Sequence, residues 1–584
     1  MAKKKIKKIP YGTADFERIQ TKNMYYIDKT HYIPLIEESP DHIFLIRPRR
    51  FGKSLWMSVL ETYYDINKKE KFNEFFKGTY IGQNPTEERN SYLILYFNFA
   101  AVNPDIKKVA RSFESNCKTE INDFINRYER FIDKQTKETV ISSENLDTKL
   151  QTLFRYFKSN ETIKTYLLID EYDNFTNTII ATAGTKEYHN LTQGKGVVRF
   201  FFNMIKSGTT GSNSAISRSF ITGVSPVTMD DVTSGHNIGN NLSLNEEFNE
   251  LYGFTQDDVK NILKYYYSKN FLKLDPDFCL KIMTLWYNNY QFSKNANKVL
   301  YNTDMVLYFL LEAKNRKIIP DDMIDSNVRI DYRKLKHLMI VDQKFNGNFS
   351  LLKTIVENQE IVSDIAKSFP IEELTLQENF ISLLFYFGLL TINKTKRGKP
   401  LLKITNLTVQ KLMFGYLRDA YLDQNIFRID PYELSNLIGD MAYDGEWKPF
   451  FKFLTNEIEK QTAIRDFLDG EKVVQTFVMA YLNISDYFIT ESEKEAGKGY
   501  ADLFLQPFLA AFPDMEYSYL IELKYLSKSE FTEKKLENKI KDAKNQLAKY
   551  SDDDKLKKIV GSTKLKRLVV VYKAWELIHL EEVL

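Results

Sequence analysis

Two stretches of this sequence carry residue types that could bind phosphate groups and divalent metal ions. In the first, a Gly-Lys-Ser tripeptide at 52–54 lies between a strand-like run ending at Ile46 and a helical stretch beginning at Leu55. In such a turn, backbone N–H groups surround an anion, the lysine reaches the outer phosphates and the serine hydroxyl ligates Mg²⁺. Arg47 stands where such loops usually begin with glycine, and a lone Gly-Lys-Ser is common by chance.

A pair of carboxylates supports the interpretation of the Gly-Lys-Ser turn as a nucleotide-binding loop. Asp170 and Glu171 directly follow the apolar run Tyr166–Ile169. At the carboxyl end of a strand, Asp170 could hold Mg²⁺ while Glu171 polarises the attacking water. An acidic pair after a strand is usually the start of a solvated loop, but the order strand, Gly-Lys-Ser, helix, strand and strand-Asp-Glu is much rarer. A later strand ends at Thr222, whose side chain we expect to sense the γ-phosphate.

The sequence therefore predicts ATP or GTP binding with Mg²⁺, whereas the arginines of the loop leave the geometry needed for hydrolysis open. The residues expected at the nucleotide are Arg50, Phe51, Gly52, Lys53, Ser54, Leu55, Asp170 and Thr222. Ser54 and Asp170 are the expected metal ligands, and Glu171 is the expected catalytic carboxylate. Arg199 and Arg218 are candidate arginine fingers by position only.

The second stretch lies near the C-terminus. Glu522 and Lys524 fall on the same face of a strand because side chains alternate with a period of two, and Asp502 on a neighbouring strand could join them. Two carboxylates that hold Mg²⁺, with a lysine that stabilises the nucleophile or the developing charge, suit phosphodiester hydrolysis. The alternative is an edge strand whose Glu and Lys point to solvent, and Glu-x-Lys alone favours that alternative.

The elements that must position these residues follow an α/β pattern. Continuous apolar runs alternate with helical stretches from residue 42 to 220, which predicts a buried parallel sheet. Residues 237–424 read as mostly helical, apart from a hairpin at 390–404 that gives a winged-helix-like order. Its basic tip could contact phosphates or be a solvated turn. We predict three domains: 1–235 around the first site, 236–428 as a coupling region, and 429–584 with a core at about 470–575.

Several motifs of the first half resemble those of the AAA-ATPase-like family, bacterial proteins that pair a P-loop ATPase with a C-terminal nuclease-like domain. They are Ile-Pro-Tyr-Gly at 9–12, Tyr-Ile-Asp-Lys-Thr at 26–30, Arg-Pro-Arg-Arg-Phe-Gly-Lys-Ser at 47–54, Leu-Ile-Asp-Glu-Tyr-Asp at 168–173 and Phe-Ile-Thr-Gly-Val-Ser-Pro at 220–226. In that family the arginine-rich loop is the usual Walker A motif. Asn288-Asn289-Tyr290 departs from the family's more usual Asp-Gly-Tyr.

The tail reads as helix 471–482, three strands, helix 532–550 and strand 567–572, an αβββαβ order that resembles the restriction-endonuclease-like core of PD-(D/E)xK nucleases. Asp502 and Glu522-Leu523-Lys524 match the motif of that superfamily, with Ala501 in place of its proline. Gln546 and Tyr550 resemble its Gln-x-x-x-Tyr element, and Glu471 is a candidate for the acid of its first helix. The resemblance implies a Mg²⁺-dependent nuclease, with Mn²⁺ possible, in which Asp502 and Glu522 bind metal and Lys524 and Gln546 are catalytic.

Composition limits the kinds of partner, metal site and cellular location that this protein could have. With 81 Lys and Arg against 78 Asp and Glu, the 584-residue chain has a net charge of only +3, so a nucleic-acid surface must be local. Cys117 and Cys279 have no disulfide or zinc spacing. The longest near-apolar run, 381–392, is short of the roughly 20 residues that a membrane span needs. We expect a soluble cytoplasmic protein without a membrane partner.

The leading hypothesis is a nuclease whose cleavage of nucleic acid, DNA rather than RNA, is regulated by its ATP state, in a chain that could form homo-oligomers. A role in defence or mobile-element biology follows from the resemblance alone. One alternative is a nucleotide-switched signalling or oligomerising ATPase whose nuclease-like domain only binds nucleic acid. Another is a non-enzymatic scaffold with two degenerate sites.

Overall fold

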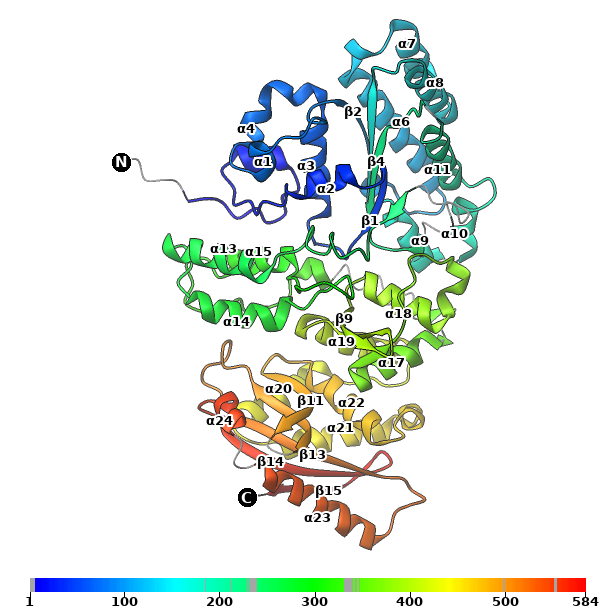
Figure 1. Ribbon diagram of the computed structural model, residues 1–584. Coiled ribbons are helices and arrows are strands. Elements are labelled where there is room, and N and C mark those ends of the chain that lie inside the picture. Colours follow the sequence, from blue (N-terminus) through cyan, green and yellow to red (C-terminus); the bar gives the residue numbers. More distant parts are fainter. Residues whose placement is uncertain are drawn as a thin grey trace.

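The chain folds into three successive tiers (Figure 1). The computed structural model describes residues 6–183, 185–211, 213–227, 231, 239–329, 340–341, 344–345, 347–496, 499–550 and 554–583. The upper tier holds the first candidate site, a largely helical tier follows, and the lower tier holds the carboxylate and lysine residues near the C-terminus. Among the described residues, no helix is long and apolar enough to cross a membrane.

The upper tier is built on a parallel sheet with the strand order β2-β3-β4-β1-β5. Its strands are β1 (His42–Ile46), β2 (Tyr92–Asn98), β3 (Lys164–Asp170), β4 (Arg218–Gly223) and β5 (Asn240–Asn241). The register pairs Ile46 with Gly223 and Ile169 with Ile221, so the carboxyl ends of β1, β3 and β4 meet at one edge. This edge brings the Gly-Lys-Ser turn beside Asp170. The predicted buried parallel sheet is confirmed.

Helices cover this sheet and extend from it. They are α1 (Phe16–Thr21), α2 (Tyr32–Glu38), α3 (Lys53–Tyr64), α4 (Phe72–Phe76), α5 (Tyr80–Gln83), α6 (Val109–Arg127), α7 (Lys134–Ser142), α8 (Leu146–Ser159), α9 (Asn174–Ala183), α10 (Thr185–Thr192) and α11 (Val197–Gly208). Strand β5 pairs with β1 a few residues beyond the predicted domain boundary at residue 235. The division at 235 and 428 remains a prediction.

The middle tier combines two helical groups with a small antiparallel sheet. The helices are α13 (Gln256–Ser268), α14 (Pro276–Tyr287), α15 (Thr303–Glu312), α17 (Gly347–Asn358), α18 (Gln377–Tyr386) and α19 (Leu407–Asp423). Strands β8 (Glu360–Val362), β9 (Leu390–Lys396) and β10 (Lys399–Ile404) form a sheet in the order β8-β10-β9, and β6 (Ile340–Val341) pairs with β7 (Lys344–Phe345). The predicted hairpin is therefore present.

Helix α18 immediately precedes this hairpin and is enclosed by protein. All of its residues from 379 to 386 are buried. A helix that reads nucleic acid must present its side chains to a groove. Helix α18 has no such face over this stretch, so its buried residues serve packing within the protein.

The lower tier is a mixed five-stranded sheet with helices on both faces, and it confirms the predicted αβββαβ order. Its elements are α20 (Pro431–Tyr443), α21 (Lys448–Lys460), α22 (Glu471–Leu482), β11 (Phe488–Ala496), β12 (Gly499–Pro507), β13 (Tyr517–Leu526), α23 (Glu533–Lys549), α24 (Asp554–Val560), β14 (Lys564–Lys573) and β15 (Glu576–Val583). The strand order is β11 to β15; β13 and β14 are parallel and the other pairs antiparallel.

The two faces of this sheet are covered by different helices. Ile521 and Leu523 belong to the core shared with α20–α22, whereas Leu520 packs with Leu547 of α23. Glu522 and Lys524 have the same parity as Leu520, so strand alternation places them on the α23 face.

Candidate active sites

The loop between β1 and α3 has the backbone of a phosphate cradle. Gly52, the N-cap of α3, adopts the left-handed region at φ 88°, which a residue without a Cβ enters without strain. Lys53, in the first turn of α3, folds back along the loop and its Nζ donates to the carbonyls of Arg47 at 3.1 Å and Pro48 at 2.8 Å. The lysine therefore lies inside the curve of the loop.

Lys53 faces the two carboxylates that end β3. Burial lowers its pKa to about 8, and the charges of Asp170 and Glu171 oppose that shift. Burial also raises the pKa of Asp170, and burial together with the Asp170 charge raises that of Glu171. Glu171 has a left-handed backbone at φ 51°. One cation and two acids are thus held together at the carboxyl edge of the sheet.

The residues at this edge fit a magnesium ion bound together with phosphate. Asp170 Oδ1 accepts from Glu171 N at 2.8 Å, whereas the buried Oδ2 atom has no hydrogen-bond partner within the described chain. Among the described residues there is no group of three or more His, Cys, Asp and Glu side chains placed to hold a metal. Mg²⁺ in nucleotide sites is usually held by one or two protein oxygens plus phosphates and water, which suits Asp170 with Ser54.

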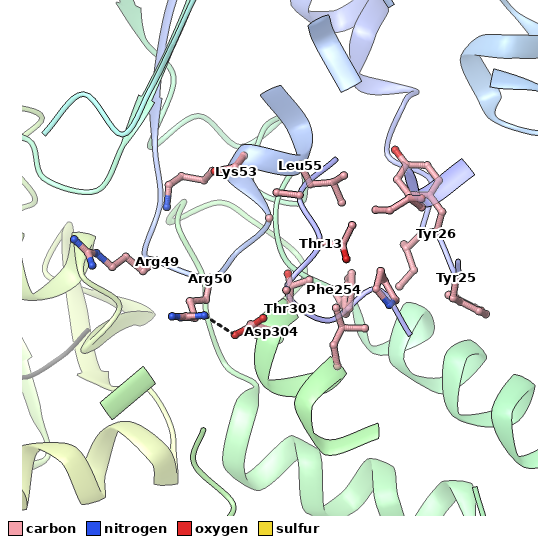
Figure 2. A pocket seen from close by; sticks show the side chains of 18 of the residues that line it. Thr13, Tyr25, Tyr26, Arg49, Arg50, Lys53, Leu55, Phe254, Thr303 and Asp304 are labelled. Carbon is pink, nitrogen blue, oxygen red and sulfur yellow. Dashed lines mark hydrogen bonds and ion pairs between the residues drawn. The ribbon is translucent and has the colours of Figure 1, made fainter. Parts of the chain in front are cut away.

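A cavity of about 390 Å³ opens over this loop (Figure 2). Arg49, Arg50 and Lys53 lie on one side of it and Tyr25 and Tyr26 on the other, the side that we call the apolar end. Ser54 and Glu171 add further polar groups to the lining. The apolar and aromatic part of the lining comes from the N-terminal segment, α3, α13, α15 and the residues before α13; it comprises Pro10, Ile19, Tyr25, Tyr26, Ile27, Leu55, Phe254, Ile262 and Leu307. A cavity with basic side chains on one side and aromatic side chains on the other suits a nucleotide, because the phosphates and the base differ in this way.

Five of the predicted nucleotide contacts line this cavity, namely Arg50, Gly52, Lys53, Ser54 and Leu55. Phe51 is buried and packs against Tyr290, with ring centroids 4.8 Å apart. Thr222 is also buried, and its hydroxyl donates to Leu45 O at 2.7 Å. These two side chains are therefore directed into the protein, because each finds its packing or hydrogen-bond partner there.

The sequence does not indicate the apolar end. Segments 9–12 and 26–30 carry part of the family resemblance, but their residue types do not place them at a cavity. The candidate arginine fingers also differ in placement. Arg218 begins β4 at the sheet edge opposite the loop and pairs with Glu88 at 2.9 Å, while Arg199 lies in the first turn of α11.

The residues after Glu171 fasten β3 to the end of β4. Asp173 is buried and accepts from the backbone N–H groups of Val224, at 3.2 Å, and Ser225, at 2.5 Å. Tyr172 donates its hydroxyl to Ser225 O. Gly223 lies against both side chains: a Cβ there would come within 2.4 Å of Asp173 Oδ1 and of the Tyr172 ring. The two strand ends that flank the nucleotide cavity are thereby fixed to each other.

Replacing Gly223 by alanine is expected to lower the free energy of unfolding by about 1–3 kcal/mol, because the added methyl group overpacks this contact. The measurement is urea denaturation of the full chain. Gly439→Ala in α20 is the matched control, since its nearest contact would be an ordinary 3.6 Å from Tyr487. An alanine at 223 that leaves stability unchanged would contradict the tight packing of β4 against Tyr172 and Asp173.

The second site joins the predicted residues of β12 and β13. Lys524 Nζ lies 2.9 Å from Asp502 Oδ2 and 2.8 Å from Glu522 Oε2. Leu523 N also donates to Asp502 Oδ2 at 3.0 Å. Glu522 is fully buried, Lys524 is 7% exposed and the Asp502 side chain is 24% exposed. Two carboxylates and an ammonium therefore form one compact cluster. The alternative prediction, an edge strand whose Glu and Lys point to solvent, is wrong for these residues.

The electrostatics of this cluster fit a divalent cation. Burial and the nearby Asp502 charge raise the pKa of Glu522 to about 8. Burial opposes the charged form of Lys524, but Asp502 and Glu522 outweigh it and raise the lysine pKa. Glu522 Oε1 is buried and has no hydrogen-bond partner in the part of the chain that the structure describes. That oxygen and the Asp502 carboxylate are hard donors of the kind that Mg²⁺ and Mn²⁺ prefer.

Helices α22 and α23 border the cluster. Burial, with the charges of Glu522 and Asp502, raises the pKa of Tyr550, at the end of α23, to about 12. Gln546 lies one turn earlier, and its Oε1 is buried without a hydrogen-bond partner among the described residues. Glu471 at the start of α22 accepts from Tyr525 N at 3.2 Å and lies 3.8 Å from Lys539 Nζ.

Comparison with known families agrees with both sites. Residues 10–233 match the family model described as "Predicted AAA-ATPase", and residues 469–582 match that of the PD-(D/E)XK nuclease superfamily. The protein thus carries an AAA-like P-loop ATPase domain, followed in C-terminal position by a PD-(D/E)XK nuclease superfamily domain.

Among individual proteins, the chain is 25% identical over 310 residues to a protein of Azotobacter chroococcum mcd 1 described as "Uncharacterized protein in vnfD 5'region". The alignment covers 52% of each, so the chain spans about half the length of this curated relative. A solved structure, that of the Walker-type ATPase PABY2304 of Pyrococcus abyssi, aligns with a TM-score of 0.37 and 11% identity over 70% of this chain and 99% of that one.

Proposed function

We propose that this protein binds and hydrolyses ATP and that its nucleotide state regulates metal-dependent cleavage of nucleic acid by the C-terminal domain. The observation that carries the proposal is the cluster in which Lys524 bridges Asp502 and Glu522, while one Glu522 oxygen has no hydrogen-bond partner among the described residues. We propose DNA ahead of RNA as the substrate and a cytoplasmic location, with self-association and a role in defence or mobile-element biology as secondary proposals.

In the ATPase domain, Lys53 would contact the outer phosphates from inside the loop. Ser54 and Asp170 would hold Mg²⁺, which neutralises phosphate charge. Glu171 would accept a hydrogen bond from the attacking water, a role supported by its place at the cavity wall and by burial and the Asp170 charge, which raise its pKa. The apolar end, with Tyr25, Tyr26 and Phe254, would take the base.

In the nuclease domain, Asp502 and Glu522 would hold Mg²⁺ or Mn²⁺, which polarises the phosphate and lowers the pKa of a bound water. Lys524 is placed to stabilise negative charge beside both carboxylates, since its ammonium lies within hydrogen-bond distance of each. Gln546, whose Oε1 has no hydrogen-bond partner among the described residues, would orient the water or the substrate.

A continuous set of contacts could carry the nucleotide state from one domain to the other. Phe51 of the phosphate loop packs on Tyr290, whose neighbour Asn289 has φ 75°, a conformation that asparagine tolerates and that suits the glycine usual in the family. Thr391 of β9 donates to Asn289 O at 2.7 Å. The phosphate loop is thereby connected to the hairpin of the middle tier.

The same segment reaches the lower tier. Thr408 of α19 donates to Trp286 O at 2.8 Å, and the Trp286 ring lies 5.6 Å from that of Phe508, the residue that follows β12. Lys411 of α19 is buried and forms an ion pair with Asp486 at 2.6 Å. These contacts support regulation of cleavage by the ATPase domain.

The alternative function is a nucleotide-switched ATPase whose nuclease-like domain only binds nucleic acid. One observation favours it: the lysine and glutamate of the second site are almost wholly enclosed, which restricts the approach of a phosphodiester.

Cleavage assays with and without nucleotide test the regulation. The full chain is incubated with plasmid DNA, single-stranded DNA and RNA in Mg²⁺ or Mn²⁺, with ATP, with a non-hydrolysable analogue or with neither. We expect the cleavage rate to change with nucleotide in the wild type and to become insensitive to it in Lys53→Ala. Equal rates under all three nucleotide conditions would overturn regulation, and binding without any cleavage would favour the alternative.

A further inference from the structure

The carboxylates of the second site lie where two neighbouring strands separate. Within the described residues, strands β12 and β13 pair through Leu503–Leu505 and Tyr519–Ile521 and no further. In an unbroken antiparallel ladder the next pair would join Asp502 and Glu522, but the backbone pairing stops before them. Leu523 N donates instead to the Asp502 side chain, at 3.0 Å. The two arms of this fork, β12 before residue 503 and β13 after residue 521, each carry one of the carboxylates.

A fork leaves backbone groups without ladder partners, and such groups must find others when they are buried. Gln475 of α22 forms such a hydrogen bond with the β12 arm. The residue is 8% exposed, and its side-chain amide N–H donates to the backbone carbonyl of Asp502. The hydrogen bond therefore holds the β12 arm at the residue that carries the carboxylate.

Glu471 lies one helical turn before Gln475 and contacts the other arm. Its Oε2 accepts from the backbone N–H of Tyr525, the residue that follows Lys524 on β13. Residues four apart lie on one face of a helix, so a single face of α22 forms hydrogen bonds with both arms. In this arrangement Glu471 orients the strand through its backbone.

We propose that α22 is a clamp that sets the separation of the two metal-binding carboxylates, with Gln475 and Glu471 as positioning residues. This inference rests on the proposed metal-dependent function of the site. Outer-shell hydrogen bonds fix the orientation of metal ligands, and their loss typically weakens metal affinity or activity by about 10–100-fold. The separation of Asp502 from Glu522 is sensitive to such a loss because, in the described part of the chain, the register pairing of the two strands ends before these residues.

The test is a titration of the full chain with Mn²⁺ alone. Binding is measured by calorimetry and by the rise in unfolding temperature that Mn²⁺ causes. Gln475→Met keeps the length of the side chain and removes the donor, and we expect its Mn²⁺ affinity to fall by about tenfold or more. Glu471→Leu is expected to weaken binding similarly. Glu471→Gln keeps an acceptor for Tyr525 N–H and should restore most of the affinity, whereas a metal-ligand role for Glu471 predicts that it will not.

The matched control is Asn483→Leu. Asn483 is a buried amide at the other end of α22 and donates to Met479 O and to Thr490 Oγ1 of β11, away from the carboxylates. We expect it to lower the metal-free unfolding temperature but to leave Mn²⁺ affinity at the wild-type value.

The outcomes separate this inference from the proposed function. If wild type binds Mn²⁺, Asp502→Asn does not, and Gln475→Met binds as wild type does, the clamp is overturned and the proposed function stands. If wild type fails to bind Mn²⁺, both fall. An affinity loss in Asn483→Leu as large as in Gln475→Met would also overturn the clamp, because general loosening of α22 would then explain both.

Discussion

Replacing Lys524 by alanine is expected to abolish nucleic-acid cleavage, with a fall in rate of at least about 100-fold. Its ammonium is the cation that lies within 3 Å of both Asp502 and Glu522, so its removal withdraws the charge that would stabilise the nucleophile or the transition state. The same change leaves two acidic groups buried without their cation, and breaking a buried ion pair typically costs about 3–5 kcal/mol.

Loss of folding and loss of chemistry must therefore be measured separately. Cleavage of plasmid DNA with Mn²⁺ reports the chemistry, and thermal unfolding without metal reports the stability. Lys541→Ala on the exposed surface of α23 is the control, expected to leave both unchanged. Cleavage by Lys524→Ala at a rate near that of wild type, in protein shown to be folded, would exclude Asp502, Glu522 and Lys524 as the cutting site.

Replacing Lys53 by alanine is expected to reduce ATP hydrolysis by at least about 100-fold and to weaken nucleotide binding. Lys53 lies inside the phosphate loop, buried and facing Asp170 and Glu171, so its loss removes the cation at the position of the outer phosphates. Phosphate release measures hydrolysis, and titration with a fluorescent ATP analogue measures binding. Lys77→Ala, an exposed residue after α4, is the control.

The two variants together define how the domains are related. Loss of phosphate release in Lys53→Ala with cleavage intact would show that the two activities are independent. Loss of both would support regulation by the ATPase domain. Unchanged hydrolysis in Lys53→Ala would mean that the loop at 47–54 is not the hydrolytic site.

Local sequence predicts the hairpin of β9 and β10 but not the surroundings of the helix before it. Two apolar runs around a basic turn predict its strands, and the structure forms them, with Lys399 paired to Asp364 at 2.5 Å. Whether Lys394, Lys396 and Arg397 at this hairpin contact phosphates stays a prediction. The burial of α18 was not evident from its sequence, because an apolar helix packs equally well inside one domain or between two.

Sequence by itself determined four strands between residues 42 and 223, the αβββαβ order of the tail, the loop at 47–54, the carboxylates at the end of β3, and the place of Glu522 and Lys524 on one strand face. These features depend on neighbours within a few residues: apolar runs form buried strands, glycine permits the left-handed turn before α3, and alternation assigns the face of a strand. The bounds of α22, Glu471–Leu482, match the prediction for the same reason.

Only the tertiary structure decided which distant segments complete each site. Tyr25, Tyr26 and Phe254 reach the nucleotide cavity because the N-terminal segment and the region before α13 pack over the loop, whereas Phe51 and Thr222 turn inward to partners elsewhere in the chain. Likewise, alternation places Glu522 and Lys524 on one face but does not say where the β12–β13 ladder stops. There the third dimension brings α22 against both strands, and Gln475 and Glu471 form hydrogen bonds with the backbone of the separated arms.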